Sequence, residues 1–182
     1  IPREGTFPPD FSELDSPPKS LITVLYEYLI LSALACYKFD NKKVIMKRSS
    51  MLIHPHWKKD EGISIFNEWI TNIANDIRQD LDSQHYAILS KSYSKIKNEL
   101  NALPNFTFPD LKELSDVIIN DVLADLSIHK VVADYLEKGQ KFPWRSNKHH
   151  ILVGGQLLDR GFTVENLIVT YMSRDSVSKN QS

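Results

Sequence analysis

The chain has 182 residues, of which 42% are hydrophobic and 25% are charged, and its net charge at neutral pH is −1. This is the composition of an ordinary soluble domain that can bury a sizeable core. A single cysteine, Cys36, excludes a disulfide framework within the chain, which favours a reducing, cytoplasmic setting.

The first segment, residues 1–16, is polar and rich in proline, and it has neither a starting Met nor the pattern of a signal peptide. We therefore expect an irregular lead and a chain that is a piece of a longer protein. Ser16 can cap a helix with Pro17 at its first position. Apolar residues then recur at helical spacing from position 21 to 35. Because Glu27 lies near the middle of this stretch, we expect a buried helix and no membrane partner.

The next elements alternate between strand and helix. The run Met51–Ile53 predicts a buried strand, with His54 and His56 in the loop beyond its end. Helices are expected near 63–81 and 86–103, and a third begins at Pro109. These helices are long for a simple crossover, so we interpret residues 63–125 as a helical insertion.

Three further strands are predicted in the last third of the chain. They are the run from Ile128 to Ala133, "HHILVGG" and "NLIVTYM". Short apolar strands separated by helices indicate an α/β fold with a three-layer core, in which a mostly parallel sheet is covered by helices. The expected domain covers residues 17–174, and residues 175–182 form a frayed tail.

Charge is distributed unevenly along the chain. Residues 41–59 carry six bases and no acid, and residues 138–158 carry four bases and no acid. The segment between them, residues 60–137, carries fourteen acids against six bases. If the two basic segments meet in space, they form a positive surface suited to a phosphate backbone. If they do not meet, they are separate solvated flanks of two strands.

The glycines at the end of one strand carry most of the functional signal. In open α/β sheets, ligands bind beyond the carboxyl ends of the strands. Gly154 and Gly155 at such an end either permit a tight turn or let a ligand approach the backbone closely. The whole stretch "ILVGGQLLDRGFTVENLIVTY" resembles motif V of superfamily-two helicases, whose second lobe has a RecA-like fold. Arg160 and Gly161 match the Arg-Gly pair of that motif.

A narrower resemblance covers most of the chain, from about Ser16 to Arg174. "SSMLIHPHWKK" together with "HILVGGQLLDRGFTVENLIVTYMSRD" is similar to the Z1 domain, a bacterial and phage family to which endonuclease activity has been ascribed. The resemblance implies that a nucleic acid, expected to be DNA, contacts His54, His56, Lys58, Gly154 and Gly155. It also implies that Arg160, Gly161 and Thr163 face a nucleotide cleft. Thr163 stands where many helicases carry an aspartate near the ribose.

The motifs missing from the sequence limit what this chain can do alone. It contains no G-x-x-x-x-G-K-[ST] phosphate loop and no acidic Walker-B-like strand, and it ends before an arginine-rich motif VI. The resemblance therefore implies half of a motor. ATP and Mg²⁺ would bind in the full-length parent, together with the missing first RecA-like lobe. This piece alone would hold no cofactor or metal, would contain no catalytic residue and would not hydrolyse ATP.

Two other functions stay open at the sequence level. The first is a metal-dependent DNA endonuclease, for which "PDLKE" at 109–113 offers the nearest carboxylates, although Asp110 is also the residue expected to cap a helix. The second is a non-catalytic protein-interaction module. His149 and His150 are expected in a solvated basic loop, and Cys36 in the core without a polar partner. Trp144 is a candidate for stacking on a base.

Overall fold

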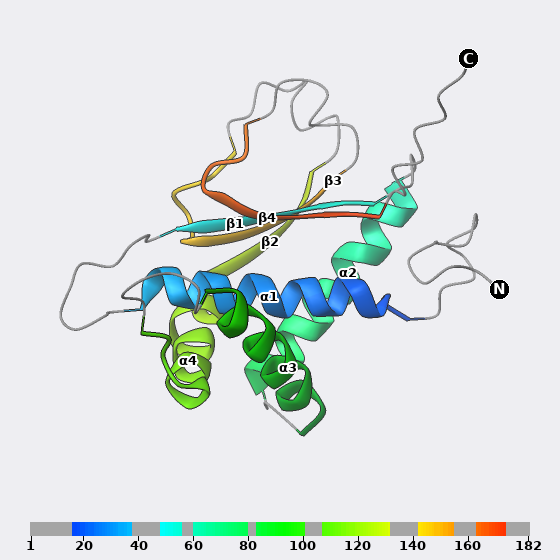
Figure 1. Ribbon diagram of the computed structural model, residues 1–182. Coiled ribbons are helices and arrows are strands. Elements are labelled where there is room, and N and C mark those ends of the chain that lie inside the picture. Colours follow the sequence, from blue (N-terminus) through cyan, green and yellow to red (C-terminus); the bar gives the residue numbers. More distant parts are fainter. Residues whose placement is uncertain are drawn as a thin grey trace, which may run out of the picture.

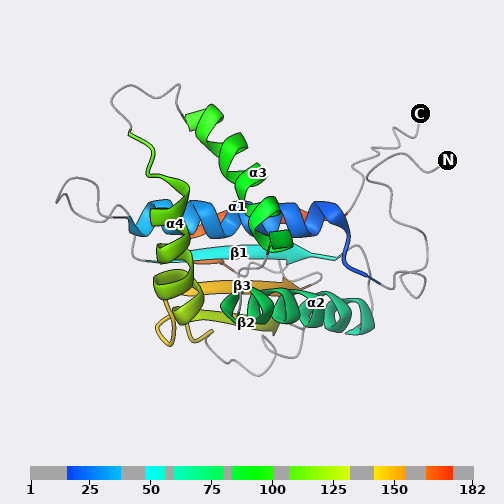
Figure 2. The same ribbon diagram turned by 90° about the horizontal axis from the view of Figure 1, so that it is seen from below.

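The structure is a computed structural model, and it describes residues 16–37, 48–55, 60–79, 83–100, 107–131, 142–154 and 163–173. In chain order the elements are a helix, a strand, three helices with two short helical turns, and three more strands. Figure 1 shows the helices gathered below the sheet, and Figure 2 shows the same arrangement from below.

Helix α1 spans Lys19–Cys36 and is the central helix of the core. It begins two residues later than predicted, with Pro18 in an extended conformation at its N-cap. The reason is the proline pair, because a residue that precedes a proline is disfavoured in the helical region, and Pro17 precedes Pro18. The backbone N–H of Ile22 donates to the carbonyl of Pro18 (3.1 Å), which closes the first turn.

Three further helices follow the first strand, β1 (Ser49–His54). They are α2 (Asp60–Gln79), α3 (Ser83–Leu100) and α4 (Leu111–Val117). Asp110 caps α4, since its side chain accepts a hydrogen bond from the backbone N–H of Glu113 (2.8 Å). The chain then continues through a π-helical turn, η2 (Ile118–Val122), and a 3-10 turn, η3 (Leu123–Asp125), directly into the next strand. The third predicted helix is therefore broken into three short pieces.

The sheet has four strands in the order β2-β3-β1-β4, and every pairing between them is parallel. Their bounds are β1 Ser49–His54, β2 Leu126–Val131, β3 His149–Gly154 and β4 Leu167–Met172. These pairings confirm the predicted α/β fold with a parallel sheet and agree with a RecA-like core. The division into an insertion and a surrounding domain stays a prediction.

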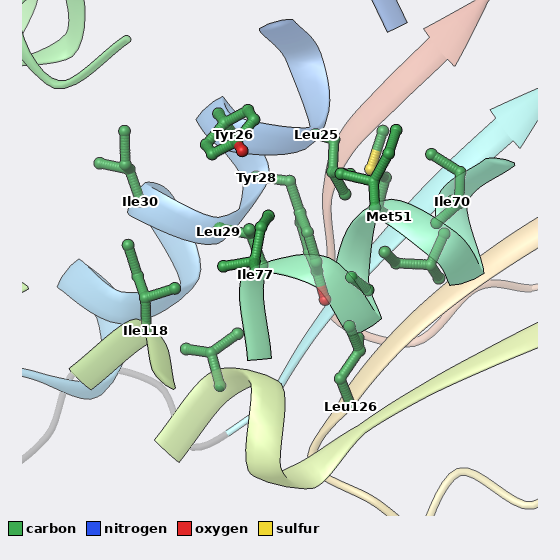
Figure 3. Packing of buried hydrophobic residues seen from close by; sticks show 14 of the residues in the cluster. Leu25, Tyr26, Tyr28, Leu29, Ile30, Met51, Ile70, Ile77, Ile118 and Leu126 are labelled. Atoms are coloured by element: carbon green, nitrogen blue, oxygen red, sulfur yellow. The ribbon is translucent and has the colours of Figure 1, made fainter. Parts of the chain in front are cut away.

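The two faces of the sheet are covered differently. Alternate strand residues such as Met51, Ile53 and Val153 face the helices and join the main core, which Figure 3 shows around Tyr28 and Leu126. The opposite face carries a smaller cluster of Leu52, Val131, Phe142 and Leu152, with Trp144 and Val164 packed against it. In the described residues this second face is covered by loop segments.

Helix α1 is long and apolar enough to cross a membrane by length and composition, and half of that stretch is buried in the structure. A core helix passes the same test, and α1 packs against both the sheet and α3. Glu27, near the middle of α1, forms an ion pair with Lys95 of α3, with 2.6 Å between carboxylate and ammonium. The helix therefore behaves as the buried core helix that the sequence predicts.

Candidate functional site

The carboxyl ends of β1, β3 and β4 lie side by side. The register of β1 and β3 pairs Ile53 with Val153, so the next residues, His54 and Gly154, end neighbouring strands at the same edge of the sheet. On its other side, His54 pairs with Met172 of β4. The two strand ends that the sequence singled out, those with His54 and Gly154, are therefore neighbours in the sheet.

His54 differs from its prediction in one respect, because it is the last residue of β1 and not part of the following loop. Its side chain is buried, with the residue 8% exposed. The strand extends this far because β4 continues beside it. The backbone N–H of Ser173 donates to the carbonyl of His54 (3.3 Å), and the Ser173 hydroxyl donates to the same oxygen (3.4 Å).

Thr163 is exposed and lies in the segment that leads into β4. That strand begins at Leu167 at the amino edge of the sheet, where the register places it beside Ser50. Val164, the residue after Thr163, packs on the second face of the sheet. The sequence grouped Thr163 with Arg160 and Gly161 in a nucleotide cleft. Arg160 and Gly161 lie outside the described residues, as do His56, Lys58 and Gly155 of the proposed nucleic-acid contact.

The two basic segments meet in the part of the chain that the structure describes. The Arg48 guanidinium donates to the carbonyls of Trp144 and Asn147 (3.3 Å for Asn147). The backbone N–H of Ser49 donates to the carbonyl of Lys148 (3.1 Å). This contact lies at the amino edge of the sheet, since β1 and β3 begin there.

One acid from the intervening segment also reaches this edge. The carboxylate of Asp125 lies 3.1 Å from the ammonium of Lys148. It also accepts hydrogen bonds from the backbone N–H of Lys148 and the side chain of Asn147, both at 3.2 Å. Partial burial raises the pKa of Asp125, but these donors outweigh it and hold the pKa below its usual value.

A buried polar network lies beneath the amino edge, and the sequence did not predict it. Nδ1 of His149 lies 2.8 Å from the hydroxyl of Ser49, which lies 2.8 Å from the hydroxyl of Ser32. The hydroxyl of Tyr28 donates to the backbone carbonyls of Ser49 and His150, both at 3.3 Å. The described buried side-chain N and O atoms all have hydrogen-bond partners.

Burial shifts the acid–base properties of this network. It lowers the pKa of His149, which is 0% exposed, to about 4. It raises the pKa of Tyr28 to about 12 and raises that of the Cys36 thiol as well. The sulfur of Cys36 lies 3.8 Å from Nε2 of His149. Neutral imidazole, thiol and phenol are therefore the stable forms at neutral pH.

These observations correct two sequence predictions. His149 and His150 were expected to be solvated, but both are buried; as the first two residues of β3 they agree with the predicted strand "HHILVGG". Cys36 was expected in the core without a polar partner, but it is half-buried beside His149. A signal was available, because both β1 and β3 begin with two consecutive polar residues, which the register pairs as Ser49 with His149 and Ser50 with His150.

Within the described ranges, no group of three or more histidine, cysteine or acidic side chains is arranged to hold a metal ion. The acids near 110 have structural partners. Asp110 caps α4, and the carboxylate of Glu113 accepts a hydrogen bond from the hydroxyl of Tyr37 (3.0 Å). The capping interpretation of Asp110 is confirmed.

The parallel sheet, its helical cover and the glycine-ended strand define an α/β domain of the open-sheet class, in which ligands bind beyond the strand ends. Comparison with known families identifies the particular one. The Z1 domain family matches residues 20–180, and the chain belongs to this family. No curated protein and no solved structure matches the chain.

Proposed function

We propose that this Z1 domain contacts the backbone of a nucleic acid at the carboxyl edge of its sheet, as the second RecA-like lobe of a helicase-like, ATP-driven protein. The observation that carries the proposal is the position of Gly154 beside His54 at neighbouring strand ends. Gly154 lacks the Cβ that would keep a phosphate away from the backbone at this strand end, and His54 ends the neighbouring strand beside it.

A second positive region suited to a polyanionic partner lies at the amino edge of the sheet, opposite the edge that carries His54 and Gly154. Arg48, from the first basic segment, contacts the loop that carries Arg145 and Lys148, from the second. The side chain of Lys148 is 58% exposed, so it remains in contact with solvent while paired with Asp125. A protein-interaction module without a nucleic-acid role would not need this clustering, which ranks that alternative lower.

Binding is tested with the 182-residue chain and fluorescein-labelled single-stranded DNA, duplex DNA and RNA of equal length. Fluorescence anisotropy measured at several salt concentrations should show binding that weakens as salt rises. Lys58→Ala should weaken binding and reduce the salt slope by about 1, as expected for one lost phosphate contact. Lys91→Ala, a change on the exposed face of α3, is the matched control and should leave both quantities unchanged. Equal effects of the two substitutions would contradict the proposal.

The motor part of the proposal concerns ATP and Mg²⁺, which the polypeptide carrying both lobes would bind. There, Arg160 and Thr163 would respond to the nucleotide while the strand ends hold the nucleic acid. Arg160→Ala should lower nucleic-acid-stimulated ATP hydrolysis in that protein and leave DNA affinity unchanged. Loss of DNA affinity with unchanged ATP hydrolysis would assign Arg160 to the other ligand.

A further inference from the structure

The side chains of two consecutive histidines, His149 and His150, point to opposite faces of the sheet at its amino edge. Side chains of neighbouring strand residues point to opposite faces, so His149 faces helix α1 while His150 faces the loop of residues 142–148. Both residues are buried, at 0% and 2% exposed. The side chain of His149 bonds to Ser49, whereas that of His150 bonds to the carbonyls of Trp144 and Asn147.

On the helical face, the imidazole of His149 joins three segments. Its Nδ1 bonds to the hydroxyl of Ser49 in β1, and its Nε2 lies beside the sulfur of Cys36 at the end of α1. Ser49 in turn bonds to Ser32, one helical turn earlier in α1. The C-terminal half of α1 is therefore fastened to the sheet through a neutral imidazole.

On the opposite face, the imidazole of His150 fastens the loop that precedes its own strand. Its Nε2 lies 3.0 Å from the carbonyl of Asn147 and 3.3 Å from that of Trp144, so this nitrogen carries the proton. Its Nδ1 is then an acceptor, and it lies 3.4 Å from Nε2 of His129 in β2. The rings of His129 and Trp144 both pack against Phe142 of the same loop.

We propose that His149 is an acid-sensitive clamp at the amino edge of the sheet. The neutral imidazole holds α1 against the start of β1 and β3. Protonation of His149 loosens this attachment while the carboxyl edge, with His54 and Gly154, keeps its structure.

The surroundings of His149 favour its neutral state. Burial is the largest influence on His149; Asp125 and Asp121 oppose it, while Lys148 and His150 act in the same direction as burial. The Arg48 guanidinium and Nε2 of His150 share the carbonyls of Trp144 and Asn147, so the loop of residues 142–148 keeps an attachment that does not pass through His149.

The expected size of the effect follows from proton linkage. The pKa of His149 is about 4 when the imidazole is buried and near 6.5 when it is exposed to solvent. The equilibrium constant for detachment of this imidazole is therefore about 30-fold larger at pH 5 than at pH 7.5. The attachment of α1 through His149 is therefore complete above pH 6.5 and is lost progressively as the pH falls toward 4.

Two backbone hydrogen bonds allow a direct comparison within the unmodified chain. The N–H of Ser49 donates to Lys148 at the amino edge, and the N–H of Ser173 donates to His54 at the carboxyl edge. Amide exchange measured by NMR, corrected for the intrinsic rate, should show protection of Ser49 falling about tenfold or more between pH 7.5 and 5. Protection of Ser173 should stay nearly constant. Equal losses at both edges, or no loss at Ser49, would overturn the clamp.

Variants extend the test to the named side chains. His149→Asn places a nonionisable amide near the position of Nδ1, and it should abolish most of the pH dependence of Ser49 exchange. His85→Asn, on α3 where the ring contacts the hydroxyl of Tyr26, is the matched control and should keep that dependence. A His149→Asn variant that still loses Ser49 protection at pH 5 as the unmodified chain does would also refute the proposal. If this variant does not fold, the comparison of the two edges in the unmodified chain decides.

Discussion

The hydroxyl of Ser49 lies 2.8 Å from Nδ1 of His149, although the two residues are 100 positions apart in the chain. Parallel pairing of β1 with β3 brings them together as the first residues of both strands. Removing this hydroxyl should be costly, because Ser49 also bonds to Ser32 in a buried setting. Ser49→Ala should lower the free energy of unfolding by about 1–3 kcal/mol in urea denaturation, since buried polar partners lose their hydrogen bond.

The control for this change is Ser94→Ala. Ser94 is exposed and donates only to a carbonyl of its own helix, Ser90 (2.9 Å). Its removal should change the free energy of unfolding by less than about 0.5 kcal/mol. A Ser49→Ala effect of the same small size would show that the buried network contributes little to stability.

Global stability should depend on pH through His149. Its pKa is about 4 in the folded chain and near 6.5 when unfolded, so the unfolded chain binds more protons between these values. The free energy of unfolding should therefore fall as pH decreases from 6.5 to 4. The total loss is expected to reach a few kcal/mol, at about 1.4 kcal/mol per pKa unit. Urea titrations at half-unit pH steps measure it, and a flat profile over this range would contradict the prediction.

Substitutions of Asp110 distinguish a role in helix capping from a role in nuclease catalysis. Because it caps α4, Asp110→Ala should cost about 1 kcal/mol of stability, whereas Asp110→Asn should cost little since asparagine also caps helices. Neither change should affect plasmid cleavage with Mg²⁺ or Mn²⁺ under the proposed function. Cleavage by the unmodified chain that disappears in the well-folded Asp110→Asn form would instead support the endonuclease.

Arg78 ties the end of α2 to the junction between η3 and β2. Its guanidinium donates to the carbonyl of Leu123 at 2.9 and 3.1 Å, and to that of Leu126 at 3.3 Å. Lysine cannot reproduce this fork of donors, so Arg78→Lys should lower the free energy of unfolding by roughly 1–2 kcal/mol. Lys91→Arg exchanges the same two residue types in the reverse direction at an exposed position, and it should have almost no effect. Thermal or urea denaturation of both variants measures the difference.

The edge strand β4 should govern self-association. This strand ends the sheet, contains no charged residue, and exposes Leu167 (41%) and Met172 (57%). The opposite edge strand, β2, carries Lys130 and is contacted by α2. A charge on an exposed apolar edge opposes strand pairing between molecules. Met172→Lys should therefore reduce aggregation in light scattering at equal stability, and unchanged aggregation would show that another surface is responsible.

Local sequence signals located most of the elements but not all of their environments. The β1 strand, the β3 strand and the cap at Asp110 follow from apolar runs and capping chemistry, which act over a few residues. The α1 start and the broken helix after α4 differ from prediction because a proline pair and the packing of η2 override simple periodicity.

The sequence by itself determined that this is a parallel α/β domain, and it predicted that His54 and Gly154 would close the same edge of the sheet. It could not determine that His149 and His150 are buried. Two polar residues before an apolar run are solvated if the strand begins after them and buried if it begins with them. Only the tertiary structure decides this, because β1 and the neighbouring helix and loop supply the hydroxyls and carbonyls that make burial of two imidazoles possible.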